Sequence, residues 1–397
     1  MKLLFCSAFM FRITDDGTYG LPSCADSFFQ KYLEVFDSVR VIGNPVRDYI
    51  DTSALVEMKD PRISIRITPN NAKPKDFKND SLIKKALMEE MRDADAVLIK
   101  PTNRKGIIAL QLAEELQKPY MIDVTGDIHN ALKQHPSIIK RLYAPILYWQ
   151  IKKAIRHCKF GLYVSKDYLQ QKFPINGVMC GCADVILEPA NEQTLIRRFK
   201  KIDAKYETDI VEISLIGFYQ GKMKGVDTAI RALSKLPENF RLNILGNGTQ
   251  KSRDHWYDYA SSLGIKNPKN RITFPTPLPN ATAVLEWLDT QDFFVLPTRS
   301  EGFGRCVAEA MSRGCVCFAT DICTMPELLE KECLHPLGDG DRLAELILKY
   351  NTDKELMKAN AKRNFEKAKE YDFEILRERR NKFLNQFKEY CESKNQK

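Results

Sequence analysis

The sequence predicts an α/β protein of two domains, each built from a parallel sheet covered by helices. A chain of 397 residues is too long for a single hydrophobic core and fits two domains of roughly 100–200 residues each. In both halves, short apolar runs bounded by turn residues alternate with helical stretches, which is typical of parallel strands joined by crossover helices. A polar, charged stretch at 187–209 has no strand pattern and separates the halves.

The strands are predicted from apolar runs that stop at turn residues. In the first half they are "KLLFCSAF" (2–9), "SVRVIG" (38–43), "AVLIK" (96–100), "PYMIDVTG" (119–126) and "FGLYVS" (160–165). The stretch "GIIALQLAEELQ" at 106–117 is predicted as a helix between two of them. In the second half they are "IVEISLIGF" (210–218), "FRLNILG" (240–246), "RITFPT" (271–276), "DFFVLPT" (292–298) and "CVCFAT" (315–320). Two Rossmann-like sheets result.

Domain boundaries follow from where the strand patterns begin and end. We predict a first domain over 1–188, a linker over 189–209 and a second domain over 210–368. The tail at 369–397 is helical and heavily charged. We expect this helix to cross back to the first domain.

Composition places the chain among ordinary globular proteins, with 44% hydrophobic and 28% charged residues. The apolar N-terminal run stops before Arg12 without a small-residue cleavage site, so it predicts a strand and a cytoplasmic protein. The eleven cysteines are expected to be reduced core thiols. The C-x-C pairs at 180–182 and 315–317 lack the second half of a zinc site.

The net charge of +9 is concentrated in one segment. Residues 128–166 contain no Asp or Glu, and their uncharged run at 142–151 is far shorter than a membrane-spanning helix requires. The segment interleaves aromatic residues with eight cations: Lys133, Lys140, Arg141, Lys152, Lys153, Arg156, Lys159 and Lys166. We expect it to lie on an anionic membrane surface, which makes the protein peripheral at the inner face. A helix packed on its own domain, with solvated lysines, is the alternative. No nucleic-acid partner is expected.

The stretch "PTRSEGFGRCVAEAMSRGC" at 297–315 contains the main candidates for ligand binding and catalysis. It follows a strand, forms a glycine-rich loop and continues as a helix over 305–314, so the loop lies at the carboxyl end of the sheet, where ligands bind. Backbone N–H groups around Gly302 and Gly304, with the helix N-terminus, suit a phosphate. A carboxylate beside a phosphate is repelled, so Glu301 and Glu309 are expected to accept hydrogen bonds from hydroxyl groups. A nucleotide sugar offers this combination. The alternative makes both glutamates solvated helix residues.

At this point "SEGFGRCVAEAMSRG" resembles the E-x(7)-E signature of glycosyltransferase family 4, and "ILGNG", "RITFPTPLP" and "DFFVLPT" precede it in the order that family shows. The resemblance is specific over 213–329 and looser in the first domain. It implies a GT-B architecture, in which two Rossmann-like domains face each other across a cleft. The second domain would bind most of the donor and the first domain the acceptor.

The resemblance also implies roles for individual residues. Glu301 would contact the hydroxyls of the transferred sugar and Glu309 the ribose. Lys224 would neutralise the departing diphosphate, while Phe218 stands where the family usually has an arginine, which leaves Lys222 as the nearest compensating cation. The remaining donor-side candidates are Gly302, Phe303, Gly304, Gly217, Gly246, Phe274 and Thr276, the last two within the segment expected to contact the base.

Candidates for the acceptor side lie at the predicted strand ends of the first domain. A histidine common in the family appears as Lys100 here, and the usual glycine pair is spread apart. The set comprises Gly17, Gly20, Lys100, Asn103, Arg104, Asp127 and His129. Lys100, Asn103 and Arg104 are acceptor-side or phosphate-side candidates, and an ordinary loop-capping role is the alternative for Asp127 and His129.

The sequence therefore predicts a retaining, metal-independent hexosyltransferase without a cofactor. We expect it to move a sugar from a nucleotide sugar to a saccharide acceptor, in particular a lipid-linked capsule or lipopolysaccharide precursor. The D-x-D patterns at 93–95 and 339–341 need not bind metal. Two alternatives stay open, namely a retaining glycoside hydrolase, which also uses paired carboxylates, and a catalytically silent GT-B subunit that acts in assembly.

Overall fold

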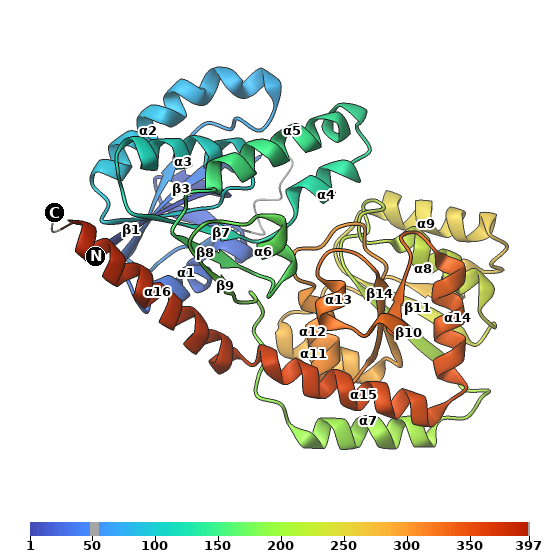
Figure 1. Ribbon diagram of the computed structural model, residues 1–397. Helices are drawn as coiled ribbons and strands as arrows, with labels where there is room; N and C mark the ends of the chain where they lie inside the picture. The colour runs from blue at the N-terminus through green and yellow to red at the C-terminus, as the bar shows by residue number, and fades with distance from the viewer. Residues whose placement is uncertain (48–54, 396–397) are drawn as a thin grey trace. The chain divides into compact units, whose positions relative to one another are not determined.

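The computed structural model describes residues 1–47 and 55–395. Contacts divide the chain into two compact units. The first comprises 1–129, 142–182 and 377–397, and the second comprises 130–141 and 183–376. The predicted α/β class is correct, because each unit is a largely parallel sheet covered by helices (Figure 1).

The sheet of the first unit has the parallel order β5-β3-β1-β6-β7-β8-β9, and β2 and β4 extend it in antiparallel fashion from the end of β1. Its strands are β1 (Lys2–Thr14), β2 (Gly17–Gly20), β3 (Ser38–Pro45), β4 (Val56–Glu57), β5 (Ile63–Ile67), β6 (Ala96–Ile99), β7 (Tyr120–Val124), β8 (Phe160–Tyr163) and β9 (Val178–Gly181). Residues 3–6 of β1 are buried on both faces, as a central parallel strand requires. The strand order reverses between β1 and β6, which makes this the switch point of the sheet.

Helices cover this sheet on both faces. They are α1 (Asp26–Leu33), α2 (Asp80–Arg92), α3 (Arg104–Glu115), α6 (Tyr168–Lys172) and α16 (Phe373–Asn395), with the 3₁₀ turns η1 (Pro22–Cys24) and η3 (Pro74–Asn79). In Figure 1, α2 and α3 lie on one side of the strands and α16 on the other. The ring of Phe383 on α16 packs on Phe160 of β8 at 5.8 Å. Two further helices, α4 (Ile128–Lys133) and α5 (Ile138–Ile155), include the segment that groups with the second unit.

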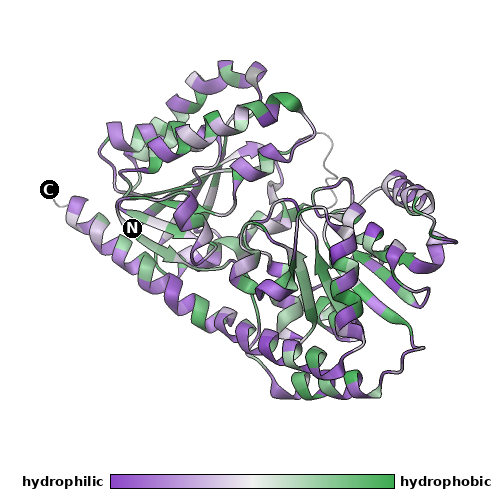
Figure 2. Ribbon diagram, turned by 45° about the vertical axis from the view of Figure 1, so that its right-hand side comes forward, coloured by the Kyte–Doolittle hydropathy of each residue, from purple (hydrophilic) through white to green (hydrophobic). Residues whose placement is uncertain are grey.

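The sheet of the second unit is parallel throughout and has the order β12-β11-β10-β13-β14-β15. Its strands are β10 (Val211–Ile216), β11 (Phe240–Leu245), β12 (Ile272–Thr273), β13 (Phe293–Leu296), β14 (Val316–Thr320) and β15 (Leu334–His335). The order reverses between β10 and β13, so the switch point lies at their carboxyl ends. Figure 2 shows the strands of both sheets as mostly hydrophobic and the helices as mixed, which places each core between sheet and helices.

The helices of the second unit are α7 (Glu192–Ala204), α8 (Val226–Lys235), α9 (Gln250–Ser262), α10 (Pro268–Arg271), α11 (Ala281–Thr290), α12 (Arg305–Ser312), α13 (Met325–Leu328), α14 (Gly340–Asn351) and α15 (Lys354–Ala368), with the 3₁₀ turns η4 (Lys331–Cys333) and η5 (Lys369–Tyr371). Most of these helices connect consecutive strands, whereas α7 precedes β10 and α14 and α15 follow β15. The predicted helix at 305–314 corresponds to α12, and Gly314 follows it with φ of +62°.

The sequence predicts a linker over 189–209, and the structure instead has α7 there, within the second unit. This helix buries Leu195 and Ile202, seven residues apart on one face. Charged residues fill most other positions, so the apolar stripe is too narrow to show in the sequence. The strand predicted over 271–276 is reduced to Ile272–Thr273, because Phe274 and the prolines after it leave the sheet.

A buried lysine lies in the core of the first unit. Lys105 on α3 donates hydrogen bonds from Nζ to the carbonyl oxygen of Gly43 at 3.0 Å and to Oγ1 of Thr68 at 2.7 Å, and also contacts Asn44. These acceptors are neutral, and burial lowers the pKa of Lys105 from 10.5 to about 7. The unfolded chain therefore binds more protons than the native state between these pH values.

We expect the free energy of unfolding of the wild type, relative to Lys105→Met, to rise by about 1–2 kcal/mol between pH 7 and pH 8.5. The sign follows from the depressed native pKa: above pH 7 the native state holds Lys105 mostly neutral, and the cost of removing its proton falls as the pH rises toward 10.5, its ordinary value. Urea unfolding of both proteins at each pH measures the difference. Equal pH dependence in wild type and variant would contradict it.

Candidate functional site

A cavity of about 400 Å³ lies at the switch point of the second sheet, where β10 and β13 end. Its lining residues come from the ends of β10 and β11, the loops after β10, β11 and β13, and α12. They are Ile216, Gly217, Phe218, Lys224, Leu245, Gly246, Asn247, Glu301, Arg305, Cys306 and Glu309. The structure thus brings together five residues that the sequence nominated: Gly217, Gly246, Lys224, Glu301 and Glu309.

Glycines allow the loop after β10 to lie close to its neighbours. Gly225 has φ of +73°, and a Cβ there would stand 1.8 Å from the carbonyl oxygen of Pro297. A Cβ on Gly217 would meet the side chain of Lys224 at 2.7 Å. These positions therefore need glycine so that the loop can hold Lys224 against the end of β13.

Lys224 and Glu301 form a partly buried ion pair, with Nζ 2.5 Å from Oε2 and side-chain exposures of 24% and 17%. Burial alone would lower the pKa of Lys224, but the Glu301 carboxylate more than offsets this, so the pKa of Lys224 is raised. The other carboxylate oxygen of Glu301 accepts from the Gly302 amide at 3.2 Å. Lys224 is thus positively charged at neutral pH and lies beside Glu301 in the cavity lining.

Glu309 and Arg305 are four residues apart on α12, so they share one face of the helix and both line the cavity. Burial raises the pKa of Glu309, and the nearby Arg305 guanidinium partly counters this. Burial also raises the pKa of Cys306 to about 12, so the cavity wall holds a thiol rather than a thiolate. The cavity therefore presents two cations and two carboxyl groups.

A bidentate ion pair fixes the two loops relative to each other. Arg299 donates from Nη1 and Nη2 to Asp227 at 2.8 and 2.7 Å, and its amide donates to the carbonyl oxygen of Met223 at 2.8 Å. This links the loop that carries Glu301 to the loop that carries Lys224. Such a bidentate pair adds geometric precision as well as energy.

The glycine-rich loop at 302–304 supports the site rather than lining the cavity. Phe303 is 5% exposed, and its ring packs on Tyr371 with 5.0 Å between centroids. The hydroxyl of Thr324 donates to the carbonyl oxygen of Phe303 at 2.9 Å. Gly304 caps α12 with φ of +93°. The side chain of Phe303 is thus an anchor in the core, whereas the group nominated beside the ligand is its backbone amide.

Three other donor-side candidates lie elsewhere in the second unit. Lys222 lines a separate cavity, so it does not replace the arginine expected at Phe218 within the cavity described above. Phe274 packs on Tyr219 with 4.8 Å between ring centroids, and Thr276 lies beyond β12. Arg305 was not predicted from the sequence, although its spacing from Glu309 on one helix could have placed it at the cavity.

Lys100 follows β6 at the switch point of the first sheet, and its Nζ donates to Asp123 Oδ2 at 2.8 Å. Both side chains are buried. The ammonium also lies 5.5 Å from the ring centroid of Phe9. Lys100 is therefore a buried, paired cation inside an aromatic cluster.

The other first-unit candidates have structural partners. Asn103 caps α3 by accepting from the Gly106 amide at 2.9 Å, and Arg104 donates to Asp80 at 2.8 Å. Asp127 accepts from the Tyr168 hydroxyl at 2.6 Å, and the His129 ring lies 4.8 Å from that of Tyr148. Gly17 and Gly20 are the ends of β2, paired with Thr14 and Phe11 of β1. Each of these candidates thus has a structural partner within the first half of the chain.

Residues 1–47 and 55–395 contain no group of three or more His, Cys, Asp or Glu side chains that could hold a metal ion. Within the same ranges, no helix has both the length and the apolar character needed to cross a bilayer.

Comparison with protein families locates the cavity in a known domain. Residues 211–353 match the family described as "Glycosyl transferases group 1". Every residue that lines the cavity falls in this range. The match thus covers most of the second unit.

Relatives cover nearly the whole chain. Protein CapJ of Staphylococcus aureus is 26% identical over 394 residues, which are 98% of this chain and 96% of that protein. HepE of Anabaena in complex with UDP superposes with a TM-score of 0.67 at 14% identity, over 97% of this chain and 100% of that one. WaaG, a glycosyltransferase involved in lipopolysaccharide biosynthesis, superposes with a TM-score of 0.62 at 16% identity, over 96% and 98%. These likenesses confirm the predicted GT-B fold.

Proposed function

We propose that this chain is a glycosyltransferase that takes a sugar from a nucleotide-sugar donor, and that the cavity between β10 and β13 binds the donor. One observation carries the proposal: Lys224, Glu301 and Glu309 converge on one cavity at the switch point of a group 1 glycosyl transferase domain. Ligands of open α/β sheets bind at such points. The fold it shares with HepE, whose structure contains UDP, supports a nucleotide as part of the ligand.

The charges suggest how a nucleotide sugar is held. Lys224 and Arg305 are the cations of the cavity and suit the diphosphate, whereas Glu301 and Glu309 accept from hydroxyls of the sugar and the ribose. When the diphosphate draws Lys224 away from Glu301, the freed carboxylate accepts from the sugar. The ion pair at 2.5 Å thus keeps both groups in place before the donor arrives.

We propose a retaining, front-face transfer of a hexosyl group without a metal ion. The bond from the anomeric carbon to the phosphate oxygen breaks, and a bond to the acceptor oxygen forms on the same face. The proton of the acceptor hydroxyl passes to the departing phosphate oxygen. Lys224 and Arg305 stabilise the negative charge that develops on the diphosphate, so the positions of these preorganised cations are the main catalytic contribution of this chain.

The donor base can be identified by the stabilisation that binding confers. UDP, GDP and ADP, with their sugars, are compared in a thermal-shift screen, because a ligand that binds the native state raises its apparent stability. One base should shift the transition clearly more than the others. Absence of any shift at millimolar concentrations would count against a nucleotide site.

Replacing Glu301 with glutamine is expected to lower kcat/KM for sugar transfer roughly 10–100-fold, since hydrogen bonds to a charged acceptor contribute about 1.5–3 kcal/mol. Affinity for the nucleoside diphosphate without sugar should not fall, because Lys224 loses a competing partner. Transfer kinetics and calorimetry measure the two effects. Unchanged donor turnover would favour a silent subunit, and cleavage of a nucleotide-free glycoside would favour a hydrolase.

The acceptor is proposed to be a saccharide on a lipid carrier, bound at the cytoplasmic face of the membrane. The observation behind this is an apolar face of α5. Its side chains are 53–75% exposed: Ile138, Ile139, Leu142, Ile146 and Trp149. Lys140, Arg141, Lys152 and Lys153 on the same helix carry positive charge. Exposed apolar side chains beside cations are typical of helices that lie in an anionic interface.

Vesicle flotation tests this placement. The wild type is expected to float with phosphatidylglycerol vesicles at low salt, and Ile139→Asp/Leu142→Asp should lower binding at least roughly tenfold through lost apolar burial. Leu82→Asp is the control, because Leu82 is similarly exposed on α2, away from this face. If the wild type does not float even at low salt, the acceptor is a soluble saccharide.

A further inference from the structure

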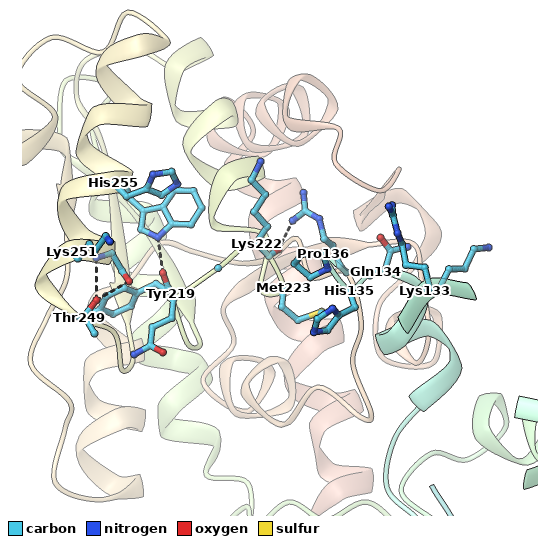
Figure 3. A pocket seen from close by; sticks show the side chains of 16 residues that line it. Lys133, Gln134, His135, Pro136, Tyr219, Lys222, Met223, Thr249, Lys251 and His255 are labelled. Carbon is cyan, nitrogen blue, oxygen red and sulfur yellow. Dashed lines mark hydrogen bonds between the residues drawn. The ribbon is translucent and has the colours of Figure 1, made fainter. Parts of the chain in front are cut away.

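The second unit contains a second, larger cavity of about 880 Å³ (Figure 3). It is formed by the loop after β10, the first turns of α9 and the segment at 133–141, all of which belong to the second unit. Lys222 and Met223 line it, whereas Lys224 of the same loop lines the donor cavity. The two cavities thus lie on different sides of one loop and share no lining residue.

All charged side chains that line this cavity, among the described residues, are positive. Lys133, Arg141, Lys222 and Lys251 line it, and no Asp or Glu does. For these four cations the described residues provide no hydrogen-bonded or ion-paired carboxylate. The fifth cation, Arg299, is held by Asp227 at 2.7 Å. Many basic side chains elsewhere in the chain are paired, as Arg40 is with Glu90 and Arg313 with Asp289.

The wall of the cavity is rigid. Tyr219 and Trp256 are both 1% exposed, and the indole Nε1 of Trp256 donates to the carbonyl oxygen of Tyr219 at 2.7 Å. Nε of Arg253 donates to the Tyr219 hydroxyl at 3.1 Å. A Cβ on Gly248 would stand 2.0 Å from the Tyr219 ring, so the backbone is closely packed there. Figure 3 shows Tyr219, Thr249, Lys251 and His255 gathered on this wall.

Neutral polar groups complete the lining. His135 accepts from the Ser137 amide at 3.0 Å and lies 2.9 Å from Lys140 Nζ, and partial burial together with this ammonium lowers the pKa of His135. Its imidazole is therefore neutral at pH 7 and adds no charge. Thr249 and Ser252 contribute hydroxyl groups to the first turn of α9.

We propose that this cavity binds a multivalent phosphate group, at a site separate from the donor cavity. Four cations without carboxylate partners repel one another, and a ligand with two or more negative charges relieves this repulsion. Lysine and arginine are the common binders of phosphate oxygens, and hydroxyls donate to the oxygens that remain. The volume lies within the range of small-molecule sites, so it accommodates a diphosphate together with the group that bears it.

The test uses inorganic pyrophosphate as the probe, titrated calorimetrically at an ionic strength of about 0.15 M. Lys222→Gln/Lys251→Gln should bind it at least roughly tenfold more weakly than the wild type. Lys266→Gln/Lys331→Gln removes the same charge from two exposed lysines outside both cavities and should leave the affinity unchanged. Lys224→Gln should retain the site, because this lysine lines only the donor cavity.

Two results would overturn the proposal. Loss of all pyrophosphate binding in Lys224→Gln would show that only the donor cavity takes phosphate. An equal loss in the two double variants would show a general effect of charge. Because no arm depends on sugar transfer or on UDP, the proposed glycosyltransferase activity and this site succeed or fail separately.

A further arm distinguishes the source of the phosphate. Neutral phosphatidylcholine vesicles, with or without farnesyl diphosphate, are floated with the protein. If the site serves a lipid headgroup, only the doped vesicles recruit the wild type, and Lys222→Gln/Lys251→Gln abolishes recruitment. If it serves a soluble phosphate ester, pyrophosphate binds as above and neither vesicle recruits the protein.

Discussion

Replacing Lys224 with glutamine is expected to lower kcat/KM for sugar transfer roughly 10²–10³-fold. Lys224 is the partly buried ammonium of the donor cavity, and the loop that carries it is held by Gly225 against Pro297 and by the Arg299–Asp227 pair. Negative charge on the departing diphosphate grows in the transition state. A fixed cation therefore stabilises the transition state more than the bound donor, and most of the loss should appear in kcat.

Arg305→Gln provides the comparison within the same cavity. Its guanidinium is more exposed than the Lys224 ammonium, so the expected loss is smaller, roughly tenfold, and shared between kcat and KM. Lys266→Gln, outside the cavity, should be unchanged and controls for net charge. Single-turnover transfer with a labelled donor separates the steps. A larger loss for Arg305→Gln than for Lys224→Gln would reverse the assignment of the two cations.

Replacing Arg198 with leucine is expected to lower the free energy of unfolding by about 3 kcal/mol. Arg198 lies on α7 and is buried, and its guanidinium donates to the carbonyl oxygens of Arg313 at 3.1 Å and Leu288 at 3.0 Å. It also contacts the Gln291 carbonyl and lies 3.0 Å from the Cys315 sulfur. Leucine leaves these buried acceptors without donors and does not fill the same space.

Arg197→Leu is the matched control for Arg198→Leu. Arg197 precedes it on the same helix, is exposed, and donates to Thr194 at 3.1 Å. Its replacement should change stability by less than about 0.5 kcal/mol. Urea unfolding, followed by circular dichroism, compares both variants with the wild type. Equal stability of the two variants would mean that α7 contributes little to the second unit.

The central strands of both sheets were predictable because they are buried on both faces and therefore appear as continuous apolar runs, such as residues 3–6 and 293–296. The position of Glu309 was predictable too, since a glycine-rich loop followed by a helix places it near Glu301. Short edge strands such as β4 and β15 have two residues each and leave no such pattern.

Other features depend on contacts between residues far apart in the chain. Lys224 and Glu301 are 77 positions apart, and nothing in either local sequence indicates that they pair with each other. The sequence nominated the amide of Phe303, and nothing near it indicates that its ring packs on Tyr371, which lies in a later 3₁₀ turn. Because α7 is rich in charged residues, its sequence did not indicate a helix with a buried arginine at its centre.

The last helix has a practical consequence for dissecting the protein. Residues 377–395 of α16 pack on the first unit, where Phe387 contacts both Phe36 and Phe160. A fragment that stops at Cys182 would therefore leave these aromatic rings exposed to solvent. To express the N-terminal half separately, one would use a circular permutant or supply the C-terminal peptide in trans. Either would cover the exposed apolar surface and so prevent aggregation of the fragment.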